Sequence, residues 1–413
     1  MPTEPSAPRA LTESELEHFY RLDELAFGEE PASQQAAEVS RRLLERDRTI
    51  GVFDGPQLVG GASIFTLEMT VPGGRIPLAG VSWVSVMPTH RRRGILSSMM
   101  RCQLHGLHES GGEAVAGLTA SEPPIYGRFG YGSASRAAAL TIQRPYSALR
   151  IPEGVDSIAL RFVPTDESYE VCEEIYARQV PERPGMLVRT PSWAMAYFTD
   201  VDQWRAGRSR LRTVLAERDG KAVGYTRYRT KYRESDGRPA GEVSVTELYA
   251  DDAASYAALL RYLTEIDLMT ITRLDGIPLD GHAMHLLQNV RAANVHVKDA
   301  LYIRLVDIDR ALASRSYAAP IDLVLDVADA LCPWNAGRWR LTGDEAGACC
   351  EPTAAAAADL ALDVRELGAA YLGGTSLAAL GAAGLVKEHR RGALAAAARA
   401  FAADLEPWIP FGF

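Results

Sequence analysis

The chain has 413 residues and a formal net charge of −9 at pH 7, with 47% hydrophobic and 23% charged residues. This length exceeds what one hydrophobic core normally holds, so two or three soluble globular domains are expected. The negative charge argues against a nucleic-acid-binding protein, and no apolar stretch is long enough for a membrane span. The five scattered cysteines indicate unpaired thiols in a reducing compartment, and the N-terminus lacks the apolar core of a signal peptide. A cytoplasmic protein without nucleic-acid or membrane partners is therefore expected.

The first region begins with two helical patterns and continues as an antiparallel meander. Apolar residues recur at helical spacing over 13–27 and 33–46, and alternating runs separated by Asp-Gly and Gly-Gly turns follow up to residue 86. A helix is expected over 94–109, with strands over 114–118 and 137–142.

Residues 151–293 repeat this order of elements, with a hairpin over 212–231, a strand over 243–249, a helix over 256–268 and a strand over 269–273. Asp251 and Asp252 stand where the first copy has arginines. Two carboxylates would repel an anionic ligand, so the second copy is expected to be unable to hold it.

From about residue 300 the pattern changes to short strands followed by helices. The alanine-rich tracts 354–361 and 393–403 consist of good helix formers. The chain ends EPWIPFGF, and so apolar a terminus is expected to pack against the protein.

The strongest chemical signal lies in residues 81–100, VSWVSVMPTHRRRGILSSMM. Val84 and Val86 alternate with Ser85 as in a strand, and Pro88 ends that strand. Three arginines and Gly94 then form a basic turn before a helix. Such a turn at a helix N-terminus is suited to an anion such as a pyrophosphate, and the alternative is a solvated basic turn.

This strand, turn and helix resemble the acetyl-coenzyme A motif of the GNAT N-acetyltransferases. Together with SEPPIYGRFGYG and the aromatic C-terminus, VSVMPTHRRRGIL resembles the Eis (enhanced intracellular survival) family of actinobacterial acetyltransferases. The resemblance implies an α/β (α+β) fold with a catalytic GNAT domain (1–150), a degenerate GNAT domain (151–293) and a sterol-carrier-protein-like α+β domain (294–413). It also implies a homo-hexamer.

The resemblance also assigns residues to acetyl-CoA, which serves as co-substrate. The strand backbone at Val84, Ser85 and Val86 would contact the acetyl group and the pantetheine arm. Ser121 and Glu122 match a position beside the coenzyme, although an ordinary loop is the alternative. The pyrophosphate would be bound at the turn and helix start, by Arg91, Arg92, Arg93, Gly94, Ile95, Leu96 and Ser97.

Two residues match catalytic positions of the family. Tyr126 matches the tyrosine that protonates the departing thiolate, and Tyr131 is its rival five residues later. A phenol of pKa about 10 can serve a thiolate of pKa about 8.5 only if it is well placed. The carboxylate of Phe413 matches the general base, which would need burial or a water relay because an α-carboxylate is weakly basic. A purely structural tail is the alternative.

The expected substrate side is acidic and aromatic. Phe27 and Glu29 match an aromatic and an acidic residue of the family's amine pocket, but Glu30 fits the pattern equally well. The penultimate residue is Gly412 where the family can carry a carboxylate, which lowers the expected negative charge. The pairs His105/His108 and His282/His285 have no acidic or cysteine ligands beside them, so no metal site is expected.

The sequence therefore predicts an acetyl-CoA-dependent N-acetyltransferase acting on amines of small cationic molecules such as aminoglycosides or polyamines. Two alternatives remain open. The C-terminal domain could make the chain an apolar-ligand-binding protein, or the substrate could be a lysine of a peptide or protein.

Overall fold

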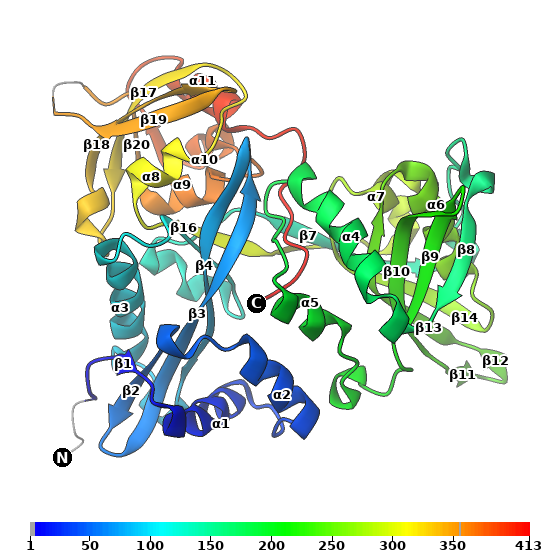
Figure 1. Ribbon diagram of the computed structural model, residues 1–413. Coiled ribbons are helices and arrows are strands. Elements are labelled where there is room, and N and C mark those ends of the chain that lie inside the picture. Colours follow the sequence, from blue (N-terminus) through cyan, green and yellow to red (C-terminus); the bar gives the residue numbers. More distant parts are fainter. Residues whose placement is uncertain (1–4, 355–356) are drawn as a thin grey trace. The chain divides into compact units, whose positions relative to one another are not determined.

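The structure is a computed structural model that describes residues 5–354 and 357–413 (Figure 1). These residues form two compact units, one of residues up to Ser135 together with Ala300–Phe413 and one of Arg136–Asp299. None of the described helices combines the length and apolarity needed to cross a bilayer. All five cysteines are unpaired, as expected from their spacing.

The first unit contains a seven-stranded sheet that begins with the predicted meander. The strands lie in the order β1 (Arg9–Ala10), β2 (Thr49–Asp54), β3 (Gln57–Val71), β4 (Gly74–Val86), β5 (Val115–Thr119), β16 (Leu301–Leu305) and β6 (Gly132–Ser133). Neighbouring strands from β1 to β4 are antiparallel, whereas β4 and β5 are parallel.

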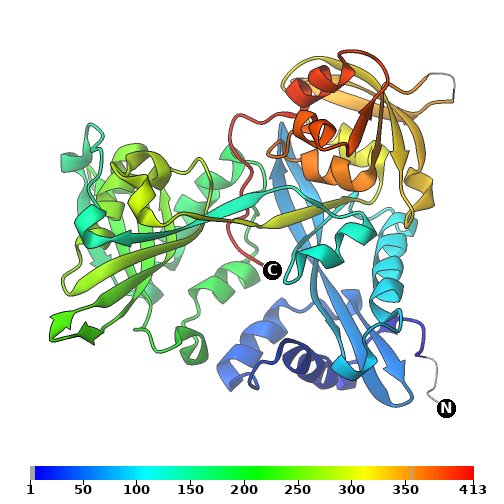
Figure 2. The ribbon, with the colours of Figure 1, turned by 180° about the vertical axis from the view of Figure 1, so that it is seen from behind.

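Three helices of this unit follow the sequence prediction closely. They are α1 (Leu16–Phe27), α2 (Gln34–Leu43) and α3 (Ile95–Glu109). Phe19 and Leu22 of α1 are buried, and α1 packs on β3 and β4. Helix α3, cyan in Figure 2, buries Ile95 and Met99 against residues of β2 and β3. The apolar spacing read from the sequence therefore marks the faces that meet the sheet.

Two strands pair on the other side of the expected domain boundaries. β7 (Arg136–Gln143), expected to complete the first region, pairs with β14 (Met269–Ile277) and β15 (His296–Asp299) in the second sheet. Figure 2 shows β7 and β15 as neighbouring antiparallel ribbons. Conversely, β16 falls in the expected C-terminal region but pairs with β5 and β6 of the first sheet. The boundaries after residues 150 and 293 remain predictions, but sheet pairing does not follow them.

The second unit contains a seven-stranded sheet with the predicted hairpin and strands. Its order is β15, β7, β14, β13 (Gly241–Ala250), β10 (Lys221–Lys231), β9 (Arg212–Arg218) and β8 (Ala159–Val163), and a short hairpin β11 (Glu234–Ser235) and β12 (Arg238–Pro239) is separate. Its helices are α4 (Tyr169–Gln179), α5 (Pro191–Phe198), α6 (Ala253–Glu265) and α7 (His282–Leu286). Helix α6 begins and ends three residues earlier than predicted.

The α6 N-terminus explains why this copy does not present an anion site. The Asp252 side chain accepts a hydrogen bond from the Ser255 backbone N–H at 2.9 Å and pairs with Arg218 at 2.7 Å. Asp251 pairs with Arg178 at 2.8 Å. The position of a bound anion is thus taken by a carboxylate of the chain itself, and these side-chain bonds hold the pKa of Asp252 well below its usual range.

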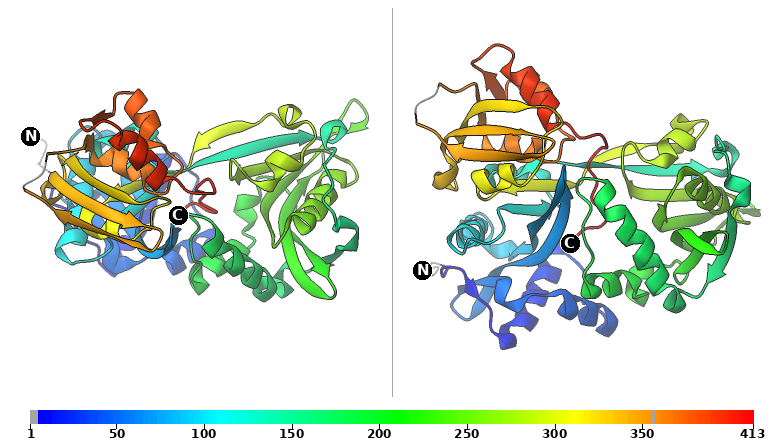
Figure 3. Two further views of the ribbon diagram at one scale, coloured as in Figure 1. Left: turned by 90° about the horizontal axis from the view of Figure 1, so that it is seen from above. Right: turned by 45° about the horizontal axis from the view of Figure 1, so that its top comes forward.

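The C-terminal residues of the first unit form a five-stranded sheet with helices. The strands lie in the order β19 (Gly347–Pro352), β18 (Gly337–Asp344), β17 (Ile321–Ala328), β20 (Leu360–Asp363) and β21 (Val386–Glu388). Figure 3 shows these strands as one layer beside α9 (Val364–Ala370), α10 (Leu377–Ala382) and α11 (Ala393–Phe401), and α8 (Ile308–Ala313) packs on β19.

The two alanine-rich tracts have different outcomes. Residues 393–401 form α11, as their composition predicts. The tract 354–361 lies partly outside the described residues, and its last residues, Leu360 and Ala361, belong to β20. The expected helix is therefore wrong there, because pairing with β17 and β21 outweighs the weak helix preference of alanine.

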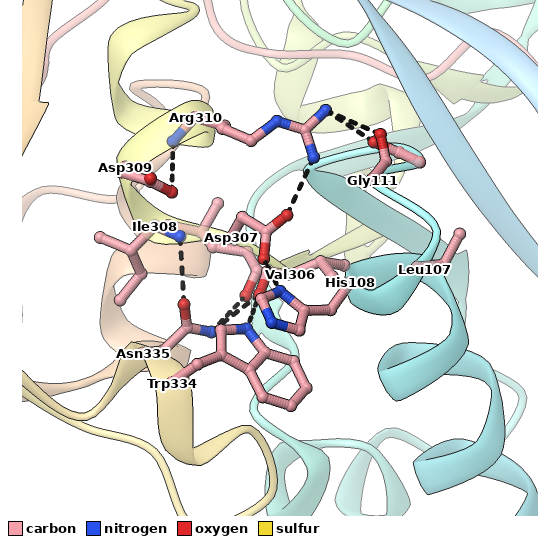
Figure 4. Close-up of polar contacts among 12 residues, drawn as sticks. Leu107, His108, Gly111, Val306, Asp307, Ile308, Asp309, Arg310, Trp334 and Asn335 are labelled. Carbon is pink, nitrogen blue, oxygen red and sulfur yellow. Dashed lines mark hydrogen bonds and ion pairs between the residues drawn. The ribbon is translucent and has the colours of Figure 1, made fainter.

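A cluster of polar contacts connects α3 to the segments before α8 and after β17 (Figure 4). The ring of His108 stacks on Trp334 with centroids 4.0 Å apart, and its Nδ1 lies 2.6 Å from an Asp307 carboxylate oxygen. The Trp334 indole N–H donates to the Val306 carbonyl, and Arg310 pairs with Asp307 at 2.9 Å. His108 thus takes part in the packing of α3 against the segments around Asp307 and Trp334.

Candidate active site

A β-bulge in β4 interrupts the alternation seen in the sequence. Ser85 pairs with Gly61 and Ser82 pairs with Ser63, so Trp83 and Val84 together lie opposite Ala62. Trp83 has a φ of 47°, which is rare for a bulky side chain. As a result Ser85 is buried, whereas Val84 and Val86 are only half-buried. The bulge re-aims the backbone of β4 at the position where the sequence predicts ligand contacts.

Beside the bulge, β4 and β5 separate. Their ladder contains the pairs Ala79–Ala116 and Gly80–Gly117, although β4 continues to Val86 and β5 to Thr119. A cavity of about 380 Å³ begins where the pairing stops. The two strands line it with Val81, Ser82, Trp83, Val84, Leu118 and Thr119. Backbone groups of the bulged strand are therefore available to a ligand in this opening.

The chain's last two residues also line this cavity. A Cβ placed on Gly80 would lie 3.1 Å from the Phe413 ring, so that ring packs directly on the strand at the end of the ladder. A Cβ on Gly412 would lie 3.8 Å from the Thr119 hydroxyl. Ile409 and Phe411, just before, are buried. The prediction of a packed aromatic tail is confirmed.

Tyr126 and Ser121 line the same cavity, from the segment after β5. Tyr126 is half-buried, and burial together with the nearby Glu122 carboxylate raises the pKa of its hydroxyl. Its rival Tyr131 is 1% exposed, its hydroxyl is buried without a hydrogen-bond partner, and it is absent from the cavity lining. The two rings meet edge to face with centroids 6.0 Å apart. Of the two tyrosines, the one at the cavity can reach a ligand there.

The basic turn precedes α3 with two left-handed residues, Arg92 (φ 64°) and Gly94 (φ 81°). Arg91 donates to the Ala26 carbonyl at 3.2 Å and Arg93 pairs with Asp54 at 3.2 Å, while all three arginines stay exposed. Gly94 occupies the N-cap position and has no side chain that could accept from the helix. The first backbone N–H groups of α3, at Ile95, Leu96 and Ser97, can therefore donate to an anion.

The C-terminal end of α1 forms the acidic and aromatic side of the cavity. Phe27 and Glu29 both line it, whereas Glu30 is absent from the lining. Of the two acidic residues that fit the sequence pattern, Glu29 is therefore the one that lines the cavity. Asp23 and Trp83 are among the lining residues that the sequence did not predict. Asp23 precedes Phe27 by one helical turn, and that spacing could have revealed it.

Asp23 is unusual among the carboxylates of this chain. Its Oδ1 is buried without a hydrogen-bond partner. Burial, together with the charges of Glu29 and Glu24, raises the pKa of this carboxyl from 3.8 to about 7. No group of three or more His, Cys, Asp or Glu side chains that could hold a metal ion occurs within the described ranges.

Comparison with known proteins agrees with this architecture. The acetyltransferase (GNAT) domain matches residues 7–134 and, through a second such family, 185–305, and the sterol carrier protein domain matches 308–410. The chain is 47% identical over 406 residues to an uncharacterized N-acetyltransferase of Streptomyces avermitilis, covering 98% of this chain and 99% of the relative. It is 33% identical over 391 residues to N-acetyltransferase Eis of Mycobacterium tuberculosis, covering 92% of each.

A solved structure, that of Eis1 from Mycobacterium abscessus, has a TM-score of 0.82 at 33% identity and covers 99% of this chain and 100% of its own. The chain belongs to the Eis family of GNAT N-acetyltransferases. The predicted fold class, two GNAT domains followed by a sterol-carrier-protein domain, is confirmed.

GNAT acetyltransferases use acetyl-CoA, and the residues of this Eis-family enzyme fit that co-substrate. The uncapped start of α3 and the exposed arginines suit a pyrophosphate. The bulge and the separation of β4 from β5 expose backbone groups for an extended pantetheine arm. The second GNAT domain has no such uncapped helix start, because Asp252 caps α6.

Proposed function

We propose that this Eis-family enzyme acetylates primary amines of small cationic molecules, with aminoglycosides and polyamines as the candidate classes. The observation that carries the proposal is the cavity at the end of the β4–β5 ladder, which is lined by Tyr126, Phe413 and Glu29. Its volume of about 380 Å³ suits a small molecule. Assembly as a homo-hexamer and a cytoplasmic location remain predictions from the sequence.

In the proposed reaction Tyr126 is the general acid. Acetyl-CoA supplies the activated acetyl group, and the thiolate that departs must gain a proton. A phenol of pKa about 10 is protonated at neutral pH, and the raised pKa of Tyr126 makes it a weaker acid, so the transfer depends on close placement beside the thiolate. Backbone N–H groups of the bulge at Trp83 and Val84 are the proposed partners of the thioester oxygen.

The carboxylate of Phe413 is the proposed general base. The attacking amine arrives protonated at neutral pH and must lose protons during transfer. Support comes from the seating of the Phe413 ring on Gly80, beside the point where the strands separate. In this proposal the packed ring holds the terminal carboxylate near the cavity that Phe413 lines.

Gly80→Ala tests the role of the contact between the Phe413 ring and Gly80. The added Cβ would meet the flexible end of Leu67 at 2.6 Å and the Phe413 ring at 3.1 Å, so the ring must give by a few tenths of an ångström. We expect kcat to fall by up to about tenfold, less than the roughly hundredfold cost of a 1 Å misplacement. Gly74→Ala in the same strand is the matched control, because nothing lies within 4 Å of its Cβ. An unchanged kcat for Gly80→Ala would mean that the tail position is immaterial.

The proposed function itself is tested by incubating the purified protein with acetyl-CoA and a panel of amines while following the release of free thiol. Aminoglycosides and polyamines should accelerate release, and a lysine-containing peptide should do so much less. Faster turnover of the peptide would favour the alternative of a peptide or protein lysine acetyltransferase. Release that no amine accelerates, together with tight acetyl-CoA binding, would refute the proposal.

A further inference from the structure

One carboxyl group of the cavity has no role in the chemistry proposed above. Asp23 lies on α1, lines the cavity, and keeps its Oδ1 buried without a hydrogen-bond donor from any described residue. A buried carboxylate without donor or counter-ion is costly, and such a group usually serves a ligand or is neutral. The structure therefore leaves a place for a positive group that the chain does not supply.

The ionisable groups around Asp23 do not supply a positive charge to pair with it. Glu24, whose side chain accepts from the Ala32 backbone N–H, and Glu29 both raise its pKa. Across the cavity lie the neutral hydroxyl of Tyr126 and the terminal carboxylate of Phe413, and β4 contributes residues that do not ionise, 81–84. Arg91 of the basic turn donates to the Ala26 carbonyl at the end of α1. The ionisable groups that line the cavity are thus acidic or neutral.

Aromatic side chains line the cavity together with Asp23. Phe27, Trp83 and Phe413 are among them, and Phe27 is 48% exposed. Aromatic faces attract ammonium groups, and aromatic side chains beside a carboxylate form a suitable site for an alkylammonium ion. It offers little to an uncharged or anionic group.

We propose that Asp23 binds a second ammonium group of the substrate, so that the enzyme selects diamines and polyamines over monoamines. This inference rests on the proposed function, because it assumes that the other amine of the same molecule is acetylated at the Tyr126 and Phe413 side of the cavity. Asp23 then determines specificity and takes no part in the acetyl transfer.

The ionisation of Asp23 makes the selection dependent on pH. With a pKa of about 7, this carboxyl is largely protonated at pH 6 and largely ionised at pH 8. An ammonium ion binds the ionised form, so diamine binding strengthens as the pH rises through 7 and releases a proton below it. The second ammonium keeps its own charge over this range because its pKa is about 10. For diamines whose amines are five or more carbons apart, the two amines titrate nearly independently, so deprotonation of the attacking amine follows the same pH dependence as in a monoamine and cancels in the ratio.

The kinetic test compares α,ω-diamines of five to eight carbons with monoamines of the same length. For the wild type, the ratio of kcat/KM for diamine to that for monoamine should rise between pH 6 and pH 8. Asp23→Asn should lower this ratio at pH 8 by about ten- to a hundredfold, the range for a hydrogen bond to a charged group, and remove its pH dependence. Monoamine turnover should fall far less than diamine turnover, because a monoamine has no second ammonium group for Asp23 to bind.

Glu17→Gln is the matched control, because it removes one negative charge from the same helix at an exposed site paired with Arg41. It should leave the ratio and its pH dependence unchanged. Equal loss of activity toward monoamines and diamines in Asp23→Asn would overturn the proposal, since that result would indicate a role in the transfer step. A flat wild-type ratio would also overturn it, and this readout does not require the variant to fold.

Calorimetry without acetyl-CoA separates this inference from the proposed function. Titration of the wild type with pentane-1,5-diamine in buffers of different ionisation enthalpy should show proton release near pH 6 that vanishes near pH 9 and is absent in Asp23→Asn. Proton-linked diamine binding without acetylation of any amine would refute the proposed function but support the ammonium site at Asp23. Acetylation of amines without proton-linked diamine binding would refute the site but keep the function.

Discussion

Tyr126→Phe should lower kcat by about 10²- to 10⁴-fold, the usual contribution of a positioned general acid. The variant keeps the ring that meets Tyr131 edge to face at 6.0 Å and removes only the hydroxyl at the cavity. Acetyl-CoA affinity should therefore stay close to that of the wild type. Steady-state thiol release and equilibrium coenzyme binding measure the two quantities separately.

Tyr131→Phe is the matched control for this experiment. The Tyr131 hydroxyl is buried without a hydrogen-bond partner, and burial raises its pKa far above the ordinary value. Its removal should leave kcat unchanged and leave stability equal or higher by about 1 kcal/mol, since an unsatisfied buried group is lost. If Tyr131→Phe, and not Tyr126→Phe, abolished turnover, the general acid would have been assigned to the wrong tyrosine.

Asp329→Ala should destabilise the protein by about 3–5 kcal/mol, because it leaves a buried guanidinium without its partner. Asp329 follows β17, and both of its carboxylate oxygens accept from Arg304 of β16, at 2.8 and 2.7 Å. Neither side chain is more than 2% exposed. The same carboxylate accepts from the backbone N–H groups of Leu331 and Cys332. Urea unfolding of wild type and variant under identical conditions gives the difference.

The double variant Arg304→Met with Asp329→Leu provides the comparison that isolates the pair. Both charges are then replaced by apolar groups, so the double variant should be more stable than Asp329→Ala alone. If the double variant were no more stable than Asp329→Ala, the loss would come from packing and backbone contacts and not from the unpaired charge.

The sequence predicted most elements of the first and second sheets because their signals are local. Alternation, Asp-Gly turns and helical spacing depend on neighbouring residues, and they place α1, α3 and β5 within one to three residues of the predicted bounds. The strand exchange of β7 and β16 has no such signal. Both are ordinary apolar strands, and which sheet accepts them depends on partners more than 100 residues away.

The tract 354–361 shows the same limit on a smaller scale. Its composition matches that of α11, yet Leu360 and Ala361 are in a strand because β17 and β21 provide edges for pairing. Helix propensities of a few tenths of a kcal/mol per residue are outweighed by the hydrogen bonds of a complete strand ladder.

By itself the sequence determined the family, the basic turn before α3 and the positions of Tyr126, Phe27 and Glu29, since motif spacing and helical periodicity are written along the chain. Only the tertiary structure decided that β4 bulges at Trp83 and parts from β5 after Gly80, that Phe413 packs on Gly80, and that Asp23 lines the same cavity. The physical reason is that a bulge, a close approach and a carboxylate oxygen buried without a donor are properties of two or more segments brought together.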